Sequence, residues 1–244
     1  MRRQPKVITI SAAGKGERMK ASIAELGFPE DTPKPLLPTG NKETLVGRIT
    51  RQAMKIANVE IYANYDTIKP IGEHPDTPKD IQLLVNRNIS GPLGPLYLDV
   101  FRSGDQSMMA AGDFWADFKW SDFLAFHDTQ STPVSILVAP SVPTYEGARF
   151  NVTDNGIVKN WERVERTSST DLINIGAYIV DPEKLVLQKI REMTTHKEDP
   201  FNDTMINSGL MSAYVLDEPA FNVNNAEIYR AMASYSAHKP RIEL

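Results

Sequence analysis

The sequence has 244 residues, of which 41% are hydrophobic and 24% charged, and it carries a formal net charge of -4. This length and composition are typical of one α/β domain with a substantial core, so we predict a single domain over residues 1–244. Scattered Lys and Arg residues and the acidic balance exclude a nucleic-acid partner, and the lack of cysteine excludes disulfides and thiolate sites. No run approaches about 18 apolar residues, so we expect a cytoplasmic protein that does not cross a membrane.

The predicted elements of the first half alternate between strand and helix, which is the βαβ pattern of an α/β fold. Thr44 is expected to cap a helix whose apolar face begins at Leu45. The stretch 65–80 is rich in Pro, Asp and Lys and is predicted to be a loop. Apolar runs predict buried strands over residues 7–10, 59–63, 81–85, 108–111 and 134–139.

The second half mixes a hairpin with strands and helices. Asp154-Asn155-Gly156 predicts the turn of a hairpin within 152–158. Helices are predicted over 182–193, over 202–211 and from Asn225 to about residue 234.

A glycine-containing loop, Ser11-Ala12-Ala13-Gly14-Lys15-Gly16-Glu17-Arg18-Met19, follows the first predicted strand. Gly14 and Gly16 lack Cβ atoms, so their N–H groups can face an anion, while Lys15 and Arg18 add positive charge. The loop is not a Walker loop because no Ser or Thr follows Gly14-Lys15, and Met19 stands where the dinucleotide fingerprint has its third glycine. We interpret it as a cradle for a triphosphate.

The second motif is Pro33-Lys34-Pro35-Leu36-Leu37-Pro38. Its prolines restrict φ and favour an extended path, so Lys34 is expected on a stiff segment.

Together the two motifs resemble the signature of the nucleotidyltransferases that activate sugar 1-phosphates, the NDP-sugar pyrophosphorylases. The resemblance spans roughly residues 6 to 234. Further segments match in family order: 90–96, 108–113, 145–147, 155–158, 162–164, 174–178 and 221–225. Arg163 and Val164 stand where the family has Lys and Pro, and the connection from Arg18 to Lys34 is longer than usual.

The resemblance implies a Rossmann-like, GT-A-type fold: a mixed, mostly parallel sheet flanked by helices. A nucleotide-binding half would extend to about residue 140, and a small acceptor-binding subdomain would occupy 141–244. It also implies a role for each matching residue. Arg18, Lys34 and Asp113 would be catalytic; Ala12, Ala13, Gly14, Lys15, Gly16, Asn86 and Gly91 would bind the nucleotide; Gly147, Glu162, Arg163 and Asn174 would bind the sugar phosphate; Asp113 and Asn224 would bind Mg²⁺.

The activity implied is nucleotidyl transfer from a nucleoside triphosphate to a sugar 1-phosphate, by in-line attack on the α-phosphate with release of pyrophosphate. Cytidylyl transfer to phosphocholine or a polyol phosphate is an alternative, because Tyr145, Trp161 and Tyr178 lie in the acceptor half. A glycosyltransferase is disfavoured because the chain has no Asp-x-Asp triplet. A non-catalytic nucleotide-sugar-binding module is disfavoured because Arg18, Lys34 and Asp113 are all present. The base, the sugar and the state of homo-oligomerisation stay open.

Overall fold

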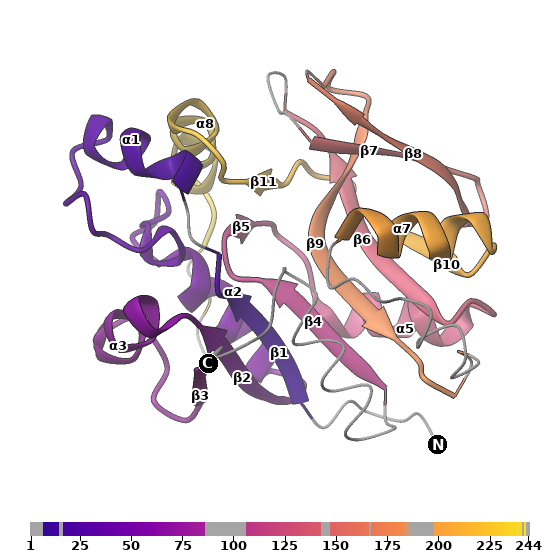
Figure 1. The fold of residues 1–244 in the computed structure, drawn as a ribbon, viewed down its shortest axis with the longest axis horizontal. Coiled ribbons are helices and arrows are strands. Elements are labelled where there is room, and N and C mark those ends of the chain that lie inside the picture. The colour runs from indigo at the N-terminus through magenta and orange to yellow at the C-terminus, as the bar shows by residue number, and fades with distance from the viewer. Residues whose placement is uncertain are drawn as a thin grey trace.

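The computed structural model describes residues 7–14, 17–85, 106–142, 147–165, 167–183, 185, 198–240 and 242, without the side chains of 17, 18, 147 and 198–200. A twisted sheet runs through its centre (Figure 1), and its main path follows the order β10-β6-β9-β4-β1-β2-β3. These strands are β1 (Val7–Ala12), β2 (Asn58–Ala63), β3 (Gln82–Val85), β4 (Ser107–Ala111), β6 (Val134–Pro140), β9 (Leu172–Val180) and β10 (Met211–Val215).

Every pairing along this path is parallel except the two made by β9, which is antiparallel to both β4 and β6. The hairpin of β7 (Gly147–Val152) and β8 (Val158–Val164) extends from β9. A separate two-stranded sheet pairs β5 (Phe114–Trp115) with β11 (Phe221–Asn222). The mixed, mostly parallel sheet predicted from the sequence is therefore confirmed.

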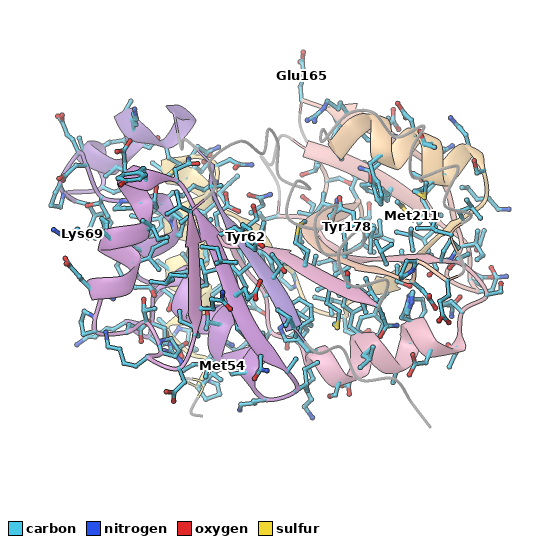
Figure 2. All side chains as sticks on the ribbon, turned by 60° about the horizontal axis from the view of Figure 1, so that its bottom comes forward. Met54, Tyr62, Lys69, Glu165, Tyr178 and Met211 are labelled. Atoms are coloured by element: carbon cyan, nitrogen blue, oxygen red, sulfur yellow. The ribbon has the colours of Figure 1, made fainter. Side chains whose placement is uncertain are left out.

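Helices flank the sheet, and the buried hydrophobic side chains form two core clusters, a larger and a smaller one. Side chains of α2, α5 and α8 belong to the larger cluster, whereas α7 covers the smaller one built on β6, β9 and β10 (Figure 1). Figure 2 shows Tyr178 and Met211 inside this smaller cluster, while Lys69 and Glu165 lie at the periphery. The helical elements are α1 (Glu17–Glu25), the 3-10 helix η1 (Lys34–Leu36), α2 (Leu45–Met54), α3 (Tyr65–Glu73), α5 (Trp120–Thr129), α7 (Glu198–Asn207) and α8 (Ala226–Ser236).

Two helix starts follow from local side-chain chemistry. The Thr44 hydroxyl accepts a hydrogen bond from the Gly47 N–H at 3.0 Å and caps α2 as predicted. Asn225 caps α8 in the same way, because its side chain accepts from the Ile228 N–H at 2.9 Å. The predicted final helix is thus confirmed, with Asn225 as its cap.

Two local predictions differ from the structure, and one helix was not predicted. Residues 65–73 form α3 rather than a loop, because Ile71 is fully buried and its packing offsets the hydrogen bond that Pro70 cannot make. The helix expected over 202–211 occurs earlier, as α7, and Met211 begins β10 instead. The helix α5 was not predicted.

The helix predicted over 182–193 falls mostly on residues outside those described. Within the ranges that the structure describes, no helix combines the length and the apolar character needed to cross a membrane.

Candidate active site

The candidate site lies at the edge of the sheet where β1 and β4 end. These two strands run parallel, so the residues that follow each of them, Ala13-Gly14 and Gly112-Asp113, emerge at the same edge. Since β9 runs antiparallel to β4, its first residues also lie there. Residues far apart in the chain therefore meet at one place.

Close packing of two strands positions Asp113. The Gly112 N–H donates to the Ser11 carbonyl at 2.8 Å, and a Cβ atom added at Gly112 would lie only 3.2 Å from the Ala12 Cβ. A side chain at position 112 would therefore crowd β1, whose atoms would have to shift by a few tenths of an ångström. Glycine at this position keeps Asp113 beside the loop that follows β1.

The β5–β11 sheet brings Asn224 to Asp113. Phe114 pairs with Asn222, and the next step of the ladder is a hydrogen bond from the Val223 N–H to the Asp113 carbonyl at 3.2 Å. Asn224 follows at once, immediately before the Asn225 cap of α8.

Lys34 begins η1, so the chain is extended on either side of Lys34-Pro35-Leu36 rather than at Lys34 itself: Pro33 has φ and ψ of -63° and 132°, and Leu37 has -59° and 130°. The Leu36 and Leu37 N–H groups bond back to Pro33 and Lys34, and both leucine side chains are buried. The Tyr229 hydroxyl of α8 donates to the Pro38 carbonyl at 2.8 Å. The segment that carries Lys34 is therefore anchored to the core and to the helix that follows Asn224.

Lys34, Asp113 and Asn224 converge. The Lys34 Nζ lies 2.7 Å from Asp113 Oδ2 and donates to Asn224 Oδ1 at 3.0 Å. The lysine side chain is 9% exposed, whereas Asp113 is 30% exposed. Lys34 and Asn224 are 190 positions apart in the sequence.

The oxygen atoms of Asp113 and Asn224 fit the donor preference of Mg²⁺. Both lie within hydrogen-bonding distance of one ammonium group, so they face a common point. Magnesium takes carboxylate and carbonyl-type oxygens and keeps several waters, so two protein ligands suffice beside phosphate oxygens. Among the residues that the structure describes, no group of three or more acidic or histidine side chains could hold a metal.

Beside the residues predicted to bind the nucleotide, a cleft of about 560 Å³ opens between α1, the segment before η1 and the start of α3. Ala12 is buried at the end of β1, while the Ala13 carbonyl accepts a hydrogen bond from the Asn64 side-chain amide. The cleft is lined by Gly14, Lys20, Ile23, Glu30, Asp31, Thr32, Pro33, Lys34, Pro35, Asn64, Tyr65, Asp66 and Thr67.

Several predicted nucleotide-binding groups cannot be placed. Lys15, Gly16, Asn86 and Gly91 lie outside the described residues. Arg18 lies in the first turn of α1, but its side chain is outside the described set.

On the acceptor side, Glu162 of β8 is held by Arg149 of β7, which lies opposite it. The Arg149 guanidinium also contacts Asp171 at 3.3 Å. The hydrogen bonds that Arg149 donates to these carboxylates raise its pKa, and the one to Glu162 contributes most. The Ser168 N–H, and to a smaller extent Arg149, lower the pKa of Asp171. Glu162 thus lies in a charged cluster that remains open to solvent.

The other predicted acceptor residues occupy β7 and β8. Gly147 begins β7 opposite Val164, and Arg163 is exposed on β8 opposite Ala148.

Asn174 lies on β9 and is buried. Its amide donates to the Tyr178 hydroxyl, and its carbonyl oxygen accepts from the Gly176 N–H at 2.8 Å. Gly176 has φ of +85°, and a Cβ atom there would lie 2.9 Å from that of Ala111. The backbone of β9 at position 176 therefore requires glycine. This residue lies against Ala111, the last residue of β4.

Sequence reasoning missed Asn64 and Arg149. Asn64 follows β2 directly, so the rule that ligands bind beyond the carboxyl ends of parallel strands could have indicated it. No comparable signal marks Arg149, because its pairing with Glu162 depends on the register of the hairpin.

Comparison with solved structures finds this fold in known proteins. HddC from Yersinia pseudotuberculosis aligns with a TM-score of 0.70 and 15% identity, over 95% of this chain and 99% of HddC. A "putative glucose-1-phosphate thymidylyltransferase" from Bacillus anthracis, solved in complex with a sucrose, aligns with a TM-score of 0.71 and 13% identity, over 97% of both chains. No protein-family model matches the sequence, and a search of curated proteins finds no significant match. The likeness establishes the fold over nearly the whole chain.

Proposed function

We propose that this protein is a nucleotidyltransferase that joins a nucleoside triphosphate to a sugar 1-phosphate, giving an NDP-sugar and pyrophosphate. The observation that carries the proposal is the convergence of Lys34, Asp113 and Asn224 at the carboxyl edge of β1 and β4. These residues come from three motifs that match the family in order. Support also comes from the fold shared with a protein described as a thymidylyltransferase.

The proposed reaction depends on positive charge and on positioning. A sugar phosphate is already ionised at neutral pH, so its oxygen can attack the α-phosphorus without a strong general base. The bond to pyrophosphate breaks in line, and negative charge grows on the leaving group. Lys34, which lines the nucleotide cleft, would neutralise this charge together with Arg18.

Asp113 and Asn224 would hold Mg²⁺, which supplies Lewis-acid neutralisation of phosphate oxygens when bound. The acceptor would lie toward β7, β8 and β9. Glu162 offers a carboxylate suited to a polyhydroxylated molecule, and Arg163 offers a cation for its phosphate. Asn174 is buried and bonded to Tyr178 and Gly176, so its side chain would have to reorient to reach the acceptor.

The first experiment measures pyrophosphate release with Mg²⁺ across ATP, GTP, CTP, UTP and dTTP against common sugar 1-phosphates and phosphocholine. One active pair that is lost in Asp113→Asn would support the reaction and name both substrates. Activity with phosphocholine and with no sugar 1-phosphate would show that phosphocholine, the alternative acceptor, is the substrate. Silence of every pair, in a protein that still binds a nucleotide sugar, would overturn the proposal.

A further inference from the structure

Tyr65 is the most exposed large aromatic side chain in the described part of the chain, with 76% of its surface in solvent. The ring lines the cleft that also contains Gly14 and Lys34. Tyr65 is not part of the described hydrophobic core clusters, and no role follows for it from the reaction chemistry. An exposed aromatic face inside a concave cleft is suited to stack on a planar ligand.

The backbone that presents Tyr65 is held firmly. Tyr65 is the first residue of α3, which is anchored by the fully buried Ile71. The preceding residue, Asn64, donates its side-chain amide to the Ala13 carbonyl. The backbone at Tyr65 is therefore tied to the loop after β1, where the phosphates are proposed to bind.

Charged residues of both signs line the cleft, Lys20 and Lys34 beside Glu30, Asp31 and Asp66. Lys34 directs its ammonium toward Asp113 and Asn224. Asp66 follows Tyr65 in the sequence and lines the same cleft, so a phosphate is better placed near Lys34 and an uncharged planar group near Tyr65.

We propose that Tyr65 is the stacking platform for the base of the nucleoside triphosphate, with the phosphates directed toward Gly14 and Lys34. This inference rests on the proposed function, because it assigns the base to one end of the same cleft. Every nucleobase has a π face, so the ring contributes to affinity without selecting among bases. Tyr65 is thus a binding residue for the nucleoside rather than a residue that determines which base is used.

Calorimetric titration tests this with the full chain, in Mg²⁺, using ATP, GTP, CTP, UTP and dTTP, and tripolyphosphate as the ligand without a base. Tyr65→Ala should weaken binding of every nucleotide that the wild type binds by roughly 5- to 150-fold, the range expected for losing one base–aromatic stack. Tripolyphosphate binding should be unchanged. Tyr65→Phe keeps the ring and should bind nucleotides as the wild type does. Because the side chain is mostly exposed, both variants should keep the wild-type melting temperature.

The other outcomes distinguish a failure of the stacking role from a failure of the proposed function. Equal nucleotide affinity in Tyr65→Ala and the wild type would overturn the stacking role and leave the proposed activity standing. An equal loss for tripolyphosphate would also overturn it, because the ring would then act on the phosphate site. A loss confined to one base would show recognition of the base edge instead. A wild-type protein that binds no nucleotide at all would overturn the proposed function and this inference together.

Discussion

The Lys34 ammonium lies 2.7 Å from Asp113 Oδ2, in an ion pair between the η1 segment and the end of β4. Each partner has a second proposed role, since Lys34 would bind phosphate and Asp113 would bind Mg²⁺. The pair must therefore separate when substrate and metal bind. If these roles are correct, Lys34 would compete with a divalent cation for the oxygens of Asp113 and Asn224 in the absence of nucleotide.

Replacement of Lys34 by methionine should therefore strengthen metal binding in the nucleotide-free protein. Lys34→Met removes the competing ammonium but keeps a side chain of similar length, so Mn²⁺ affinity should rise by about fivefold or more, the lower end of usual coupling between sites. Electron paramagnetic resonance of free Mn²⁺ measures this directly. Nucleotide affinity should fall in the same variant.

Lys20→Met is the matched control, because Lys20 lines the same cleft but lies on α1. Its Mn²⁺ affinity should equal that of the wild type. If Lys34→Met bound Mn²⁺ no more tightly than Lys20→Met does, competition at Asp113 would be wrong.

The buried ionic network around Glu43 should be important for stability. Glu43 is fully buried and contacts Arg48 at 2.9 Å and Arg51 at 3.0 Å. Glu43→Gln would remove the negative charge that both guanidinium groups share. Arg48 would still pair with Asp117, and Arg51 with Asp76. We expect a loss of roughly 3 kcal/mol in the free energy of unfolding, the lower end of the range for breaking a buried pair. Urea unfolding followed by circular dichroism measures it.

Glu25→Gln provides the comparison for this variant. Glu25 and its partner Arg230 are 57% and 56% exposed, so the loss should be at most about 1 kcal/mol. Equal losses in the two variants would show that burial does not govern the contribution of Glu43.

The contribution of Asp76 to the stability of the protein should depend on pH and should be lost in acid. Burial alone would raise the pKa of Asp76, but hydrogen bonds from Arg51 and Thr44 outweigh it and hold the pKa below its ordinary value of 3.8. A lowered carboxyl pKa stabilises the folded state above 3.8, and this contribution disappears as the pH falls below that value. Asp76→Asn should therefore be less stable than the wild type near pH 6, and the difference should shrink near pH 3. Urea unfolding at both pH values tests this, and a difference that stays constant would contradict it.

Gly176 should tolerate no side chain, because its φ is +85° and an added Cβ atom would lie 2.9 Å from the Ala111 Cβ. Gly209 also has positive φ, +65°, but a Cβ atom there would meet nothing within 4 Å. Gly176→Ala should therefore lower the free energy of unfolding by at least about 1 kcal/mol more than Gly209→Ala does, the extra cost of overpacking. Thermal and urea unfolding compare the two. Because Ala111 precedes Gly112-Asp113, Gly176→Ala should also lower turnover, whereas Gly209→Ala should not. Equal losses of stability and of turnover in the two variants would show that backbone strain, and not the contact with Ala111, determines the effect.

The local features around the candidate site were predictable because their chemistry is local. The stiff segment around Lys34 and the caps at Thr44 and Asn225 depend on the properties of neighbouring residues. Apolar runs predicted β1, β2, β4 and β6 for the same reason, since a strand buried on both faces must be apolar along its length.

The sequence by itself determined which chemical groups are available and which strands are buried, whereas the tertiary structure decided which groups meet. The order of motifs suggested that Lys34, Asp113 and Asn224 act together, but their contact depends on the β5–β11 pairing and on α8, which lie far from Lys34 in the chain. The pairing of Glu162 with Arg149 depends on hairpin register, and α3 forms because Ile71 finds a place in the core. Such contacts are set by the packing of distant segments, and no short stretch of sequence contains the geometry of its future neighbours.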